Sequence, residues 1–133
     1  MEAREIKFRV WDNVDFMSSP FTLQDLQDGK IKFCNDLPVM RFTGLKDRNG
    51  KEIYEGDVLS DYTETDEGIK KSHCQVLWNE ACGSWELDMS MIQNRSYTFY
   101  LAEELLDFEY EISGNIYENP ELLTAPTTGE KKD

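Results

Sequence analysis

The side chains that most often act in catalysis or bind metals are scarce in this sequence. His73 is the only histidine, and it directly precedes Cys74; the other two cysteines are Cys34 and Cys82. On a strand, His73 and Cys74 would point to opposite faces and could not easily bind one metal ion. The chain also lacks the nucleophile motifs that accompany hydrolytic triads. We therefore expect a non-enzyme without catalytic residues, metal or cofactor, and we expect the cysteines to be reduced thiols.

Carboxylates are the second possible source of chemistry. Glu109 and Glu111 share one face of a predicted strand, about 6.8 Å apart, which is a separation that paired catalytic acids use. The segment 61–68 holds four carboxylates, but it lacks the ligand spacing and the terminal Glu of a calcium-binding loop. Because exposed acidic faces are much commoner than active sites, we interpret both groups as solvated surface.

Charge is distributed unevenly along the chain. The formal net charge is −13; the segment 1–51 contributes +1, whereas 52–95 and 96–133 contribute −7 each. Such a surface repels the phosphate backbone, so direct nucleic-acid binding is disfavoured. The acids either keep the protein soluble or form a face for a basic partner, up to and including mimicry of DNA. The acids that we single out for partner binding are Glu103, Glu104, Asp107, Glu109 and Glu111.

Alternation of apolar and polar residues predicts a mainly β protein. In the segment 5–11, Ile6, Phe8 and Val10 share one face. The further predicted strands are 39–42, 58–62, 74–79, 85–90, 97–101 and 108–117. The predicted turns are Asn49-Gly50, Gly56-Asp57 and Gly83, and the segment 63–71 is predicted to be a polar loop. Helix is expected only as short pieces near 22–27, 102–107 and 120–123.

Trp11 lies opposite the apolar face of the first predicted strand. We expect its side chain to pack against the following segment, 16–38, or against another subunit. Trp11 is therefore a candidate partner-binding residue, and we expect a homo-oligomer. Residues 1–123 are predicted to form one domain, with the irregular segment 13–38 inserted before the barrel core and 124–133 as a flexible C-terminal tail. The chain shows no signal peptide and no apolar run that could span a membrane, so we expect a cytoplasmic protein without a membrane partner.

Three blocks of the sequence resemble the YopX family. They are residues 4–12, 42–58 and 112–123, they occur in the family's order, and the resemblance extends over residues 4–123. Proteins of this family are encoded by temperate phages and prophages of bacteria. The resemblance implies a small antiparallel SH3-like β-barrel with short helical additions, in the cytoplasm of the bacterial host. It implies no activity, cofactor or site residue.

Two classes of function remain open. The first is a non-enzymatic protein-binding or assembly module of a phage or prophage, which would form a homo-oligomer or bind a basic host or phage protein. The alternative is a nucleic-acid-associated factor in phage replication or regulation, or an acidic DNA mimic that modulates a host protein. The nucleic-acid reading rests on fold analogy and on the phage context alone.

Overall fold

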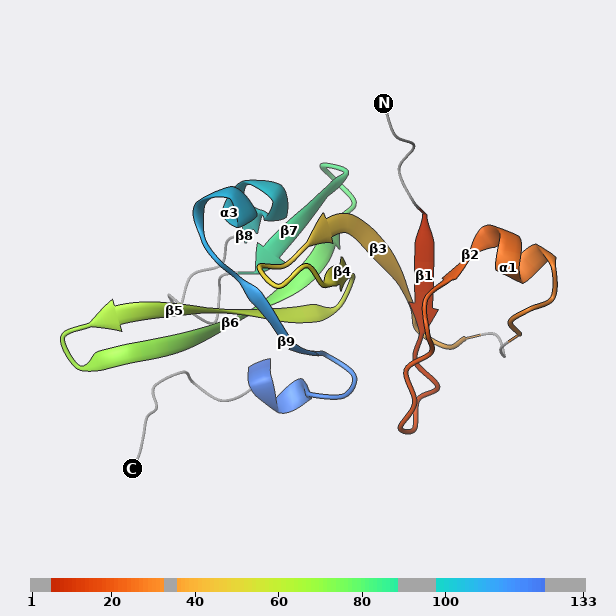
Figure 1. The fold of residues 1–133 in the computed structure, drawn as a ribbon, viewed down its shortest axis with the longest axis horizontal. Coiled ribbons are helices and arrows are strands. Elements are labelled where there is room, and N and C mark those ends of the chain that lie inside the picture. The colour runs from red at the N-terminus through yellow and green to blue at the C-terminus, as the bar shows by residue number, and fades with distance from the viewer. Residues whose placement is uncertain (1–5, 33–35, 89–97, 124–133) are drawn as a thin grey trace.

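Two antiparallel β-sheets make up most of the protein. The computed structural model describes residues 6–32, 36–88 and 98–123. In Figure 1 the sheets lie side by side, and a few short helices flank them. The expectation of a mainly β fold with short helices is confirmed. The tail predicted at 124–133 lies outside the described residues.

The first sheet has the strand order β2-β1-β3-β4. β1 (Lys7–Val10) pairs with β2 (Phe21–Thr22) on one side and with β3 (Val39–Lys46) on the other, and β3 pairs with β4 (Glu52–Tyr54). The segment predicted to be irregular, 13–38, therefore contributes a strand to this sheet. β3 extends beyond its predicted end at residue 42, and it curves toward the second sheet (Figure 1).

The second sheet has the strand order β8-β7-β6-β5-β9. Its strands are β5 (Asp57–Thr65), β6 (Gly68–Asn79), β7 (Ser84–Asp88), β8 (Thr98–Tyr100) and β9 (Glu111–Asn115). Every neighbouring pair is antiparallel. All four of the predicted strands that map to β5–β8 are confirmed within the described residues, as is the turn at Gly83, where φ is +66°.

The prediction of a polar loop at 63–71 is wrong. β5 and β6 continue as a hairpin that extends away from the rest of the second sheet (Figure 1), with Thr63 opposite Lys70 and Glu64 opposite Ile69. Threonine favours strands, and Gly68 adopts φ +114°, which the tight connection requires. The residues of this segment are polar because both strands of the hairpin are exposed to solvent, and not because they lack regular structure.

The strand predicted at 108–117 is shorter than expected. α3 (Leu101–Asp107) ends at Phe108, whose N–H donates to the Glu104 carbonyl at 2.9 Å, and the Phe108 side chain is 49% exposed. The Tyr110 carbonyl accepts from the Arg48 N–H at 3.0 Å. Because residues 108–110 form hydrogen bonds with the end of α3 and with the 47–50 turn, the chain joins the sheet only at β9.

The remaining helices are short. α1 (Leu23–Gln27) begins with a capping box, in which the Thr22 hydroxyl accepts from the Asp25 N–H at 3.1 Å and the Asp25 carboxylate accepts from the Thr22 N–H at 2.9 Å. η1 (Pro120–Leu123) is a single 3₁₀ turn. Among the described helices α3 is the longest, and none of them could span a bilayer.

Two apolar clusters hold the sheets together. The larger one gathers Ile53 of β4 with Leu59, Cys74, Val76, Leu87 and Leu101 of β5, β6, β7 and α3, and with Tyr110 of the segment between α3 and β9. The smaller one is formed by Trp11, Met40, Phe42 and Tyr54. Because β4 contributes Ile53 to one cluster and Tyr54 to the other, this short strand connects the two halves of the core.

Candidate functional site

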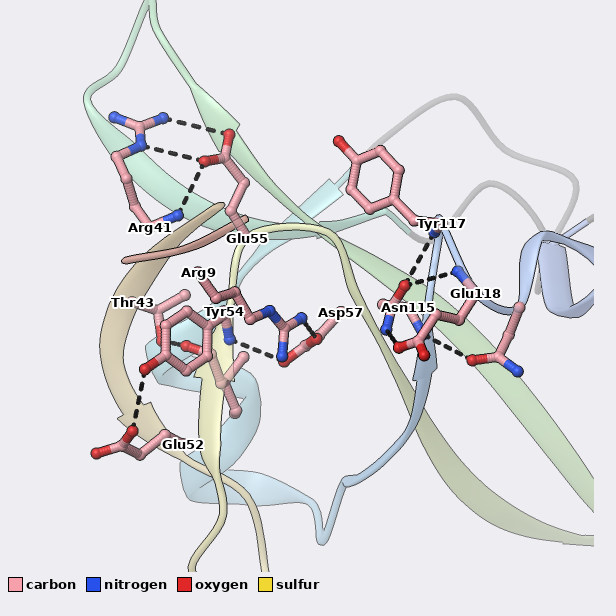
Figure 2. A network of polar contacts seen from close by, with 12 residues as sticks. Arg9, Arg41, Thr43, Glu52, Tyr54, Glu55, Asp57, Asn115, Tyr117 and Glu118 are labelled. Carbon is pink, nitrogen blue, oxygen red and sulfur yellow. Dashed lines mark hydrogen bonds and ion pairs between the residues drawn. The ribbon is translucent and has the colours of Figure 1, made fainter. Parts of the chain in front are cut away.

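A buried ion pair joins the two sheets at the start of β5. Asp57 lies at the predicted Gly56-Asp57 turn, and its carboxylate accepts the Tyr54 N–H at 2.8 Å. Its other oxygen binds the Arg9 guanidinium of β1 (Figure 2), and that guanidinium also lies 4.7 Å from the centre of the Tyr54 ring. Gly56 has φ +87°, a conformation that glycine adopts without strain.

The charged groups of this cluster form ion pairs with one another. Asp57 is 1% exposed, and burial raises its pKa while Arg9 opposes that rise. A hydrogen bond from Lys7 lowers the pKa of Glu52, and the Tyr54 hydroxyl donates to Glu52 at 3.1 Å. These partners are internal to the fold, so we interpret the cluster as a structural connection between the sheets.

The block 112–123 and the Asn49-Gly50 turn are also held by side-chain caps. The Asn115 side-chain oxygen accepts the N–H groups of Tyr117 at 3.0 Å and Glu118 at 2.8 Å (Figure 2). The Asp47 carboxylate accepts the N–H groups of Asn49, Lys51 and Ile112, each at 2.9 Å. Asp47 is buried, whereas Asn49 and Gly50 at the tip of the turn are exposed. A carboxylate that caps three amides is better placed inside.

An aromatic groove opens where β1 and β3 of the first sheet meet β6 and β7 of the second. Its volume is about 270 Å³, and its lining residues are Ile6, Lys7, Phe8, Arg41, Phe42, Trp78 and Trp85. Trp78 and Trp85 are direct cross-strand partners in the β6–β7 hairpin, with ring centres 4.9 Å apart in an edge-to-face arrangement. We refer to this groove as the first hollow.

Arg41 holds the indole wall of the first hollow in place. Its guanidinium lies 5.0 Å from the centre of Trp78 and 5.2 Å from that of Trp85. The Glu55 carboxylate accepts from the Arg41 Nε at 3.1 Å and from its Nη2 at 3.3 Å (Figure 2). A guanidinium fixed by two hydrogen bonds cannot easily swing away, so both rings are pre-organised before any ligand arrives.

A second hollow lies on the other side of Trp85. It has a volume of about 330 Å³ and is lined by Leu45, Ser84, Trp85, Tyr100, Ala102 and Glu103. Tyr100 is 50% exposed, and its neighbour Phe99 is also exposed. Trp85 is therefore a shared wall between two adjacent hollows of mainly apolar character.

The acids that the sequence singles out come from α3, from β9 and from the segment between them, and not from one strand face. Glu103 and Asp107 are exposed on α3, and Glu103 lines the second hollow. Glu104 accepts the Tyr110 hydroxyl at 2.9 Å, and Glu109 pairs with Arg48 at 3.1 Å. Glu111 is half-buried on β9, opposite Ser60.

Trp11 is inside the protein. It is 8% exposed, contacts Met17 and stacks on Tyr117 with ring centres 6.3 Å apart. Of the two placements that the sequence allowed, packing against the 16–38 segment is the one observed. The reason is that the chain turns back after Asp12 and covers this face of β1. The burial of Trp11 argues against the prediction that its side chain offers an exposed patch to a partner.

Cys74 and His73 are neighbours on β6, and neither lines the two hollows. Cys74 is buried in the larger core cluster, where desolvation raises its pKa to about 12. His73 is the neighbouring residue of β6 and is half-buried; burial and the nearby Lys71 lower its pKa. The candidate site residues that sequence reasoning missed are Arg41, Trp78 and Trp85. Their juxtaposition depends on how the two sheets meet, although the Trp78–Trp85 pair follows from the predicted hairpin.

Comparison with known proteins gives a family and similar solved structures. A crystal structure of protein EF1440 from Enterococcus faecalis superposes with a TM-score of 0.59 and 23% identity, covering 91% of this chain and 99% of that chain. At this identity the likeness concerns the fold alone. None of the curated proteins matches the chain. The family described as "YopX protein" matches residues 7–124, and because this match covers most of the sequence, the chain belongs to the YopX family.

Proposed function

We propose that this protein is a non-enzymatic protein-binding module, and that the two hollows beside Trp85 form its docking surface. Membership of the YopX family, together with the phage and prophage setting that the resemblance implies, supports an accessory role in the cytoplasm of a bacterial host. The larger core cluster, which side chains from both sheets enclose, supports an SH3-like barrel as the scaffold.

The observation that carries this proposal is the shared position of Trp85. One indole forms a wall of both hollows, so a segment that crosses it would place side chains on either side. Partly buried aromatic side chains in preformed pockets are typical of the residues that dominate protein–protein binding energy. The Arg41–Glu55 pair keeps this surface in one arrangement, which reduces the entropic cost of binding.

Nucleic-acid binding is less well supported at the same surface. Aromatic rings beside Lys7 and Arg41 are the combination that single-stranded nucleic acids use. Lys7, however, pairs with Glu52 and Arg41 pairs with Glu55, so these cations are already neutralised. The net charge of −13 opposes a polyanion further.

The DNA-mimic alternative has weaker support from the geometry. It needs a regular array of exposed acids, but Glu104 and Glu109 are engaged by Tyr110 and Arg48. Glu103, which is exposed on α3, lines the second hollow. It is better placed to complement a positive charge on a segment bound there.

A displayed random 12-residue peptide library selected on the immobilised protein tests the proposal. We expect enriched peptides that bind the wild type and lose binding to Trp85→Leu and to Tyr100→Ala. Tyr62→Ala is the matched control, because Tyr62 is an exposed tyrosine on the β5–β6 hairpin outside both hollows. Circular dichroism establishes that each variant is folded. Failure to enrich any peptide, or equal binding to all variants, would contradict the proposal.

A further inference from the structure

We infer that the segment recognised by the two hollows is an extended, proline-containing peptide that carries a lysine or arginine at the end lying over Glu103. This inference rests on the proposed function, because it concerns the same surface. It adds the chemical class of the ligand and its direction across Trp85. The argument has three steps: the shape of the surface, its hydrogen-bonding groups and its charge.

Shape favours an extended ligand. The two hollows have volumes of about 270 and 330 Å³, and a single aromatic wall separates them. Each is too small for a helix face but can take one or two apolar side chains. A polyproline II segment has three residues per turn and presents successive flat side chains along one edge, which suits adjacent aromatic hollows. Its conformation is largely preset, so docking costs little entropy.

Two side chains of the second hollow can donate hydrogen bonds to a ligand. Tyr100 is half-exposed and carries a hydroxyl, and Trp85 carries an indole N–H; the Ser84 hydroxyl donates to Glu86 at 3.0 Å. A proline-containing segment lacks some backbone N–H groups but keeps every carbonyl as an acceptor. The Tyr100 hydroxyl and the Trp85 indole N–H, which lie among apolar side chains, can therefore donate to the carbonyl groups of such a ligand.

The charges beside the two hollows set the direction in which the peptide lies across Trp85. At the first hollow, the cations Lys7 and Arg41 are each matched by a carboxylate. At the second hollow, Glu103 is exposed on the first turn of α3, and no ion pair among the described residues involves it or Asp107. The surface is thus neutral at one end and negative at the other. A cationic residue over Glu103 would gain attraction without displacing an existing partner.

The test uses peptides selected on the wild-type protein, synthesised with a fluorescein label and titrated by anisotropy. We expect the selected peptides to contain X-Pro dipeptides and a terminal Lys or Arg. Replacing the basic residue by Glu should weaken binding by about fivefold, the upper range for one exposed ion pair. Replacing the prolines by Ala should weaken it as well. Glu103→Lys should reverse the charge preference, whereas Glu64→Lys, the same change on the exposed β5–β6 hairpin, should not.

The outcomes separate this inference from the proposed function. Peptides that bind through Trp85 without proline or without a charge preference would overturn the inference and leave the binding module intact. Selection of no peptide that depends on Trp85 would overturn both. A fluorescein-labelled oligothymidine titrated in parallel tests single-stranded nucleic acid as the ligand. If it binds and Trp85→Leu abolishes that binding, the ligand of this surface is a single strand and not a peptide.

Discussion

The Arg9 guanidinium and the Asp57 carboxylate form an ion pair that joins β1 of the first sheet to β5 of the second. Asp57 is almost fully buried, and Arg9 Nε is buried without a hydrogen-bond partner among the described atoms. If either residue of the pair is lost, little solvent can therefore reach the charge that remains. The turn at Gly56 places the Asp57 carboxylate where it reaches both the Tyr54 N–H and Arg9 of β1.

Removal of one partner of this pair should be costly. Arg9→Met leaves the Asp57 carboxylate buried without its cation, and we expect a loss of about 3 kcal/mol in the free energy of unfolding. Arg9→Met combined with Asp57→Asn should recover much of it, because an Asn oxygen can still accept the Tyr54 N–H. Urea denaturation of both single variants and the double variant gives the coupling energy. Additive losses would contradict the account.

The same pair makes a prediction about pH. Without Arg9, burial is the largest influence on Asp57 and, with the nearby Asp47, raises its folded-state pKa above the unfolded value, while the hydrogen bond from the Tyr54 N–H opposes the rise. The folded state then binds the proton more tightly, so the penalty of Arg9→Met should shrink as pH falls from 7 toward 5. Denaturation midpoints of wild type and variant at several pH values measure this. A penalty that is constant or grows on acidification would show that Asp57 is not desolvated.

His73 should destabilise the fold as it becomes protonated. Burial and Lys71 lower its pKa in the folded state, so the unfolded chain binds more protons near pH 6. Stability then rises with pH through this window and falls on acidification. His73→Gln removes the only imidazole, and we expect its melting temperature to depend less on pH between 7.5 and 5.5 than that of the wild type. Identical pH profiles for the two proteins would contradict the placement of His73.

Gly114 is required by a close contact with Asn119. A Cβ at position 114 would lie 2.3 Å from Asn119 Oδ1 and 2.7 Å from Asn119 Cγ. Asn119 Oδ1 also accepts the Asn115 N–H at 3.2 Å, so it cannot move freely. Gly114→Ala should cost about 1–3 kcal/mol, measured by thermal or urea unfolding. Adding Asn119→Ala should relieve most of the clash; a double variant that remains as unstable as Gly114→Ala would point to another cause.

Because Trp11 is buried, the expected homo-oligomer needs another contact surface. The connection between β1 and β2 exposes Val14 and Phe16, and Phe16 is 60% exposed. We propose this apolar pair as the contact between copies. Light scattering should give a mass above 15.5 kDa for the wild type and a monomer for Val14→Ser/Phe16→Ser. A monomeric wild type at micromolar concentration would remove the proposal.

Short-range patterns in the sequence predict the strands and turns well, because alternation, Asn-Gly pairs and glycine act locally. These patterns do not predict features that depend on contacts between residues far apart in the sequence. Threonine-rich polarity at 63–71 is compatible with a loop or with an exposed hairpin, and only the pairing with β6 distinguishes the two. Asp47 looks like a solvated turn residue until the Ile112 N–H reaches it from β9. The hollows form only when β1 and β3 approach β6 and β7.

The Trp78–Trp85 surface is the part of the site that could have been anticipated. The predicted turn at Gly83 places the two residues opposite each other, and paired tryptophans on an exposed hairpin indicate a binding surface. The stacking of Arg41 over both rings was not predictable, since it depends on the curve of β3 and on Glu55.

The most direct measurement is the indole region of a ¹⁵N–¹H correlation spectrum during titration with a selected peptide. The chain has three tryptophans, and Trp11, in the smaller core cluster, serves as an internal control. We predict that the Trp85 indole signal shifts most, that of Trp78 shifts with the same affinity, and that of Trp11 stays in place. Unchanged Trp78 and Trp85 signals while the peptide binds, or a shift confined to Trp11, would contradict the assignment of this surface as the docking site.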